Sequence, residues 1–273
     1  MSTQPDLHQL GVEEFAARCR DAMVPVSNKF SYFQASPLGE DDIREYVEEP
    51  IAALPTDLTA ILPPVSIVLV PYLEKPNGKD KGSTAHEAVC FEPVAEKRQA
   101  AAWQTISEGR ATLMFAVRDR QVADYHYHFY HAIASLAADY SKEDNRNRFY
   151  SLLREELRSR VHGEVDQEGW HLKEALMRRS TNLRRETKGF LEYARQALVE
   201  TLTLYLHGIC CDIDVEPGPR QLPSRNLRKR LTLLEEVYAP PDGYAVFPEE
   251  VNEAAVPTVP PASPTPPAPP SPQ

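Results

Sequence analysis

The sequence has little of what marks several classes of protein. Only 11 of its 273 residues are glycine, and four are cysteine. So few glycines exclude a collagen-like chain. The cysteines are too scattered for a disulfide framework and lack the Cys-x2-Cys spacing of a zinc site, which indicates reduced thiols. They are Cys19, Cys90, Cys210 and Cys211.

Long hydrophobic runs are also missing. The longest apolar stretch, residues 61–70, is broken by Pro63 and Pro64 and is shorter than the roughly 20 residues that span a bilayer. Residues 1–8 contain neither the basic segment nor the apolar segment of a secretion signal. We therefore expect a cytoplasmic protein without membrane contact.

Three glycine-based motifs of common enzymes are absent from the sequence. It has no Gly-x-Gly-x-x-Gly loop, no Gly-Lys-Ser/Thr phosphate loop and no Gly-x-Ser-x-Gly elbow. These absences argue against nucleotide kinases, Rossmann dehydrogenases and α/β-hydrolases.

Proline is concentrated at the C-terminal end. Residues 251–273 contain nine of the 25 prolines and a single charged residue, Glu253. Such a segment cannot bury enough apolar surface to offset the entropy of ordering, so we expect a disordered tail that samples polyproline II. The folded body is expected to end near Glu250.

The N-terminal part of the body, residues 1–140, mixes strand and helix signals. Short β-branched or apolar segments bounded by turn residues predict strands at 65–73, 88–91 and 112–118. Helical spacing predicts one helix over 12–23 and a second one that begins at Ser36-Pro37 and includes Val47. The alanine-rich segment 94–106 predicts a crossover helix. We expect a small sheet with flanking helices.

Residues 141–250 carry helical periodicity with no strand candidate. Apolar stripes over 149–161 and 172–177, and a pattern over 226–237, each predict a helix. A further stripe, over 191–209, has the spacing of a bundle seam or of a contact with a partner or a second copy. Its members are Leu191, Ala194, Leu198, Leu202, Tyr205 and Ile209. The predicted class is α+β, and the sequence leaves open whether the two parts share one core.

One predicted helix, 122–140, concentrates residues that bind metals. At 100° per residue Asp124, His128 and His131 share one stripe, whereas His126 points elsewhere. Two imidazoles and a carboxylate are a known ligand set for zinc or Fe(II). Glu200 and His207, which share one face of the seam helix, are the candidates to complete the shell. The competing interpretation is a polar flank of a half-buried helix.

Positive charge is clustered in the helical part although the chain carries a net charge of −10. Arginines at 178–179, 184–185 and 225–230 are the candidates for phosphate contacts. Acidic residues such as Glu156 and Glu164 are interspersed among them, which is typical of solvated helix faces. Nucleic acid is therefore a minority hypothesis, because non-specific binding depends on accumulated positive charge.

The hypothesis we favour is a cytosolic, non-catalytic interaction or scaffold protein. It would act through helical contacts, including the 191–209 seam, and through the proline-rich tail; no cofactor is expected. The alternative is a metal-dependent enzyme, a hydrolase in which zinc, iron or manganese polarises a substrate and lowers the pKa of water. The sequence does not decide whether the protein is an enzyme.

Overall fold

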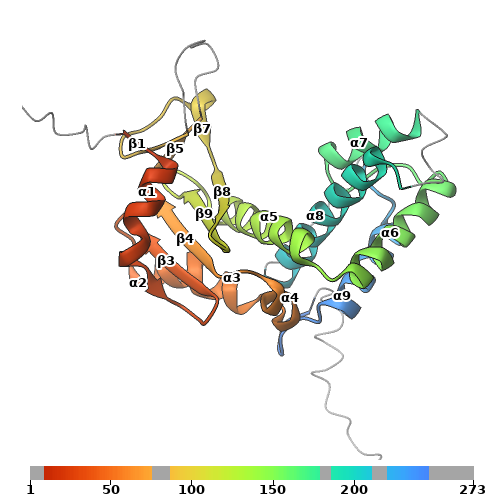
Figure 1. The fold of residues 1–273 in the computed structure, drawn as a ribbon, viewed down its shortest axis with the longest axis horizontal. Helices are drawn as coiled ribbons and strands as arrows, with labels where there is room; N and C mark the ends of the chain where they lie inside the picture. The colour runs from red at the N-terminus through yellow and green to blue at the C-terminus, as the bar shows by residue number, and fades with distance from the viewer. Residues whose placement is uncertain (1–8, 76–86, 179–185, 211–219, 246–273) are drawn as a thin grey trace, which may run out of the picture.

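The computed structural model of the chain describes residues 9–75, 87–178, 186–210 and 220–245. The protein is of the α+β class, with a sheet-containing N-terminal part and a helical C-terminal part, as the sequence predicts (Figure 1). The predicted tail, 251–273, lies outside the described residues.

A five-stranded sheet forms the centre of the N-terminal part. Its strands, in spatial order, are β2 (Val24–Pro25), β3 (Phe30–Gln34), β4 (Val65–Val70), β9 (Arg110–Ala116) and β8 (Ala102–Ser107). The three middle strands are parallel and the two outer ones antiparallel. Every residue of β4 is buried, because helices cover both faces, and this burial accounts for its continuous apolar sequence.

A second, smaller antiparallel sheet lies beside the first. Its strands, in spatial order, are β1 (Gln9–Gly11), β6 (Ala88–Cys90), β5 (Tyr72–Glu74) and β7 (Gln99–Ala100). The strands predicted at 65–73, 88–91 and 112–118 are confirmed, but the first is divided at Pro71 between the two sheets. Proline lacks the N–H that a continuous ladder would need.

The prediction of a crossover helix over 94–106 is wrong. This segment forms a short 3₁₀ turn, η3 (Glu96–Arg98), and the strands β7 and β8. Glu108 and Gly109, with φ of 53° and 72°, make the two-residue turn that returns the chain from β8 into β9. Pairing with β9 therefore overrides the weak helical preference of alanine.

The N-terminal helices are shorter than predicted. Helix α1 (Val12–Cys19) continues as the 3₁₀ turn η1 (Arg20–Ala22). The second predicted helix begins at Glu40 and not at Ser36. It consists of α2 (Glu40–Ile43), a π turn η2 (Arg44–Glu48) and α3 (Glu49–Ala52), and a further helix follows, α4 (Thr56–Ile61).

Five longer helices complete the described part of the chain. They are α5 (Val122–Tyr140), α6 (Glu143–Arg158), α7 (Gln167–Met177), α8 (Lys188–Cys210) and α9 (Ser224–Val237). All five were predicted from their apolar periodicity. Among the described residues after α5, extended pairing is limited to one bridge, between Glu164 and Gln221. No helix of the described segments is long and apolar enough to cross a membrane.

The hydrophobic core runs without interruption from the sheet into the helical part. One cluster contains Val65 and Phe115 of the sheet, Ile133 of α5, Leu202 of α8 and Leu234 of α9. Figure 1 shows α5 extending from the sheet towards the helical part, alongside α8. The two parts predicted from the sequence thus share one core.

The seam predicted over 191–209 packs inside this core. Five of its six members are buried against other elements of the same chain, and the sixth, Leu191, is 42% exposed. Within the described segments the seam therefore serves intramolecular packing.

Candidate functional site

Helix α5 presents its histidines on two different sides. Asp124 is exposed, and His128 and His131 are half-buried on the stripe that the helical spacing predicted. His126 is buried on another side, where Nε2 lies 2.9 Å from the backbone oxygen of Glu45. Its role is structural, because it connects α5 to the π turn η2.

His207 and Glu200 reach the neighbourhood of α5 because α8 packs along it. The ring of His207 lies 5.9 Å from that of Tyr130 and 6.4 Å from that of Tyr127, measured between centroids. Tyr127 in turn lies 6.2 Å from His131. Aromatic rings thus join the predicted candidates of the two helices.

The predicted ligands do not converge on a single point. In the described part of the chain, no group of three or more His, Cys, Asp or Glu side chains is arranged to hold a metal ion. Asp124 is exposed, whereas the carboxylate of Glu200 faces α7. A metal at Asp124, His128 and His131 stays a prediction.

Burial affects the protonation of this region. It lowers the pKa of His128, His131 and His207, because a charged imidazole loses hydration there. These imidazoles therefore favour their neutral form, in which they can accept a proton. In the same region the Tyr127 hydroxyl donates a hydrogen bond to the Asp166 carboxylate at 3.1 Å.

Glu200 caps the first turn of α7 from a different helix. Its Oε1 accepts hydrogen bonds from the Gly169 N–H at 2.7 Å and the Gln196 side-chain amide at 3.0 Å. Oε2 accepts from the Asp166 N–H at 3.3 Å. A Cβ at position 169 would lie 2.3 Å from Oε2, so glycine permits this close approach. Burial nevertheless raises the pKa of Glu200 to about 7.

Glu200 is expected to make stability depend on pH. Its folded pKa of about 7 exceeds the ordinary 4.5, so the folded state binds the additional proton between these values. The free energy of unfolding should fall as the pH rises through this window, by up to about 3 kcal/mol. Glu200→Gln should remove this component, because the amide does not titrate.

The measurement is urea denaturation of wild type and Glu200→Gln at pH 5 and 7.5. The free energy of unfolding of Glu200→Gln minus that of wild type should be larger at pH 7.5 than at pH 5. Glu192→Gln, on an exposed position of α8, should leave the wild-type dependence unchanged. If this difference in the free energy of unfolding were the same at both pH values, it would contradict the raised pKa of Glu200.

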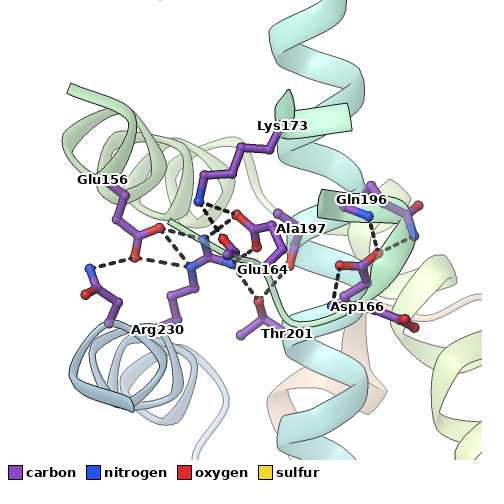
Figure 2. A network of polar contacts seen from close by, with 12 residues as sticks. Glu156, Glu164, Asp166, Lys173, Gln196, Ala197, Thr201 and Arg230 are labelled. Atoms are coloured by element: carbon purple, nitrogen blue, oxygen red, sulfur yellow. Dashed lines mark hydrogen bonds and ion pairs between the residues drawn. The ribbon is translucent and has the colours of Figure 1, made fainter. Parts of the chain in front are cut away.

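A second, fully buried polar network joins four helices next to this site (Figure 2). Arg230 of α9 is completely buried between two carboxylates. Its Nη1 donates to Glu164 Oε2 at 2.7 Å, and its Nε donates to Glu156 Oε2 at 3.1 Å. Lys173 Nζ lies 3.0 Å from Glu164 Oε1, and Tyr193 donates to the same oxygen.

The network balances two carboxylates against two cations. Burial by itself would raise the pKa of Glu164, but Arg230 and Lys173 lower it to about 2. The interpretation of Glu156, Glu164 and Arg230 as parts of solvated faces is therefore wrong for these three residues. One feature of the sequence indicates that Arg230 is buried. Asn226 and Arg230 lie on the same side of α9 as Leu231 and Leu234, which is its inward side.

The outward side of α9 forms an open groove of about 500 Å³ with α6. It is lined by Leu152, Arg225, Arg228, Lys229, Thr232, Leu233 and Glu236. Glu236 is paired with Arg148 of α6. Arg225 and Lys229 are exposed and basic, so the groove combines partly exposed leucines with positive charge.

Comparisons with models of protein families, with curated proteins and with solved structures find no match for this chain. Its function must therefore be inferred from its own residues.

Proposed function

We propose that the chain is a non-catalytic interaction protein that binds an acidic, amphipathic helix of a protein partner along α6 and α9. The observation that carries the proposal is the groove between these helices, where Leu152 and Leu233 lie beside Arg225 and Lys229. Apolar side chains of the partner would enter the groove and its carboxylates would face the basic side chains.

The buried network supports this proposal by fixing the two walls of the groove. Arg230 and Asn226, on the inward side of α9, bind Glu156 of α6. The walls are thus held in place before a partner arrives, which reduces the entropy lost on binding.

Other contact surfaces from the sequence stay proposals of lower rank. Self-association through the 191–209 seam has little support, since only Leu191 of that seam is exposed. The tail at 251–273 could offer polyproline II to an aromatic groove. A cytoplasmic location fits the unbridged Cys19, Cys90 and Cys210.

Binding can be tested with a fluorescein-labelled synthetic helix that has leucines at i, i+3 and i+7 and glutamates elsewhere. A Kd of roughly 10–100 μM is expected in moderate salt, and it should weaken as salt rises. A peptide with lysine in place of each glutamate should not bind, because it would meet like charge. Leu233→Asp should weaken binding by about tenfold or more.

The matched control moves the same charge change away from the groove. Arg225→Glu with Lys229→Glu should abolish binding, whereas Lys75→Glu with Lys97→Glu, at exposed positions near the second sheet, should leave it intact. Equal losses in the two double variants would contradict the proposal. Tighter binding of a single-stranded oligonucleotide than of the acidic peptide would replace it with the nucleic-acid hypothesis.

A metal-dependent hydrolase is the second candidate. It is favoured by one observation, namely that half-buried, neutral imidazoles from α5 and α8 gather around Tyr127. A metal held by Asp124, His128 and His131, with Glu200 or His207 nearby, would lower the pKa of a bound water.

Elemental analysis of untagged protein tests this candidate. Stoichiometric zinc, iron or manganese that disappears in His128→Ala and in His131→Ala would support it. His171→Ala, an exposed histidine of α7, is the appropriate control, since His126 is buried and its loss would disturb packing. Metal-free wild-type protein after purification without chelator, and after incubation with each ion, would exclude it.

A further inference from the structure

A row of hydroxyl side chains crosses the five-stranded sheet on the face that α1 covers. Ser66 of β4 pairs with Thr112 of β9, and Thr112 pairs with Thr105 of β8. Paired residues of neighbouring strands point to the same face. The adjoining row on this face, Val68 and Met114, is apolar and packs in the core against α1.

Ser66 is the informative member of the row. Threonine is common in strands because its side chain is β-branched, whereas serine has no such preference. Every other residue of β4 is apolar and buried. Ser66 is itself only 4% exposed. A hydroxyl at the centre of the sheet therefore calls for a polar partner, and in the described part of the chain Arg110 takes this role, with Nη1 3.4 Å from Oγ.

The hydroxyl row forms one wall of a groove of about 430 Å³ between the sheet and α1. The opposite wall comes from α1 and the turn after it, and includes Glu13 and Arg20. Trp103 also lines the groove, and it packs against the apolar cluster that contains Val68 and Met114. This volume is sufficient for a small organic molecule.

The charges around the groove leave Arg110 available for an anion. Arg20 is bound to Glu108 at 3.1 Å. Among the described residues, no carboxylate lies within ion-pair distance of Arg110. Its guanidinium only donates hydrogen bonds, and each of the three hydroxyls can donate one as well, so all four groups can donate to a bound oxyanion.

We propose that this groove binds a small aromatic anion. Its carboxylate or phosphate group would lie between Arg110 and the hydroxyls of Ser66, Thr105 and Thr112, and its ring would pack against Trp103. The site is independent of the α6–α9 groove, which lies in the helical part of the molecule, so either proposal can fail without the other.

Fluorescence offers a direct test because the chain has two tryptophans. In a Trp170→Phe background Trp103 is the only tryptophan, and its selectively excited emission is followed during titration with benzoate, phenyl phosphate and neutral benzyl alcohol. At least one of the two anions should change the emission saturably, with a Kd near or below about 1 mM, as fragment-sized ligands allow. The preferred anion identifies the carboxylate or the phosphate as the recognised group.

Variants localise the binding. Arg110→Met should weaken it by about tenfold or more, and Thr112→Val, which keeps the shape of the side chain, should weaken it severalfold. Arg118→Met, at an exposed position beyond the end of β9, should have no effect. Circular dichroism confirms that each variant is folded.

Three results would overturn the proposal. The first is that neither anion changes the emission saturably up to 10 mM, which is on the order of ten times the expected Kd. The second is that benzyl alcohol binds as tightly as the anions. The third is that Arg110→Met and Arg118→Met weaken binding equally.

Discussion

Replacing Arg230 with methionine is expected to lower the free energy of unfolding by about 3–5 kcal/mol. Methionine retains much of the side-chain volume but leaves Glu156 and Glu164 buried without their shared cation. Lys173 would remain as a partner of Glu164, whereas Glu156 would keep, within the described segments, only the amide of Asn226. The loss reflects an uncompensated buried charge, and not the strength of a single contact.

Urea denaturation at pH 7 measures this effect. Arg225→Met removes an arginine from the outward side of the same helix and should change stability by less than about 0.5 kcal/mol. Adding Glu156→Gln to Arg230→Met should recover part of the loss, because it removes one buried charge. Wild-type stability of Arg230→Met would show that solvent enters the network, which contradicts its burial.

Gly163→Ala is expected to cost about 3 kcal/mol or more through backbone strain and overlap. Gly163 has a φ of 80°, which disfavours any residue with a side chain. An added Cβ would lie 2.2 Å from the backbone oxygen of Gln221. The neighbouring backbone bonds, Glu164 N–H to the Arg220 oxygen and Leu222 N–H to the Glu164 oxygen, both at 3.0 Å, would have to separate.

The control for this substitution is Gly208→Ala in α8. Among the described residues no atom would contact the added methyl group within 4 Å, and alanine favours a helix over glycine by up to about 1 kcal/mol. Gly208→Ala should therefore match or exceed wild type in thermal melting. Equal melting temperatures for Gly163→Ala and wild type would mean that residues 163–164 do not pair with 220–222.

The helices were predictable because their signal is local. Apolar residues spaced three and four apart mark the buried side of α6 and α8, wherever the partner helix lies in the sequence. The same logic located His128 and His131 on one side of α5 and His126 on another. It could not show that His207 would meet Tyr127, because that contact depends on how two helices pack.

The crossover helix predicted over 94–106 shows where local signals end. Its alanines favour a helix by tenths of a kcal/mol each. Six backbone pairs with β9 outweigh that preference once the turn at Glu108 and Gly109 forms. The sequence does not reveal the hydroxyl row for a related reason, since Ser66, Thr105 and Thr112 become neighbours only through strand register.

The sequence by itself determined the α+β class, the long helices and the strands at 65–73, 88–91 and 112–118, because apolar periodicity and β-branching are properties of short segments. The tertiary structure alone decided which charges are buried. Glu156, Glu164 and Arg230 resemble solvated residues in the sequence, and Glu156 meets Arg230 across 74 positions of chain. A charge can leave water only where an opposite charge reaches it, and that meeting is a property of the folded chain.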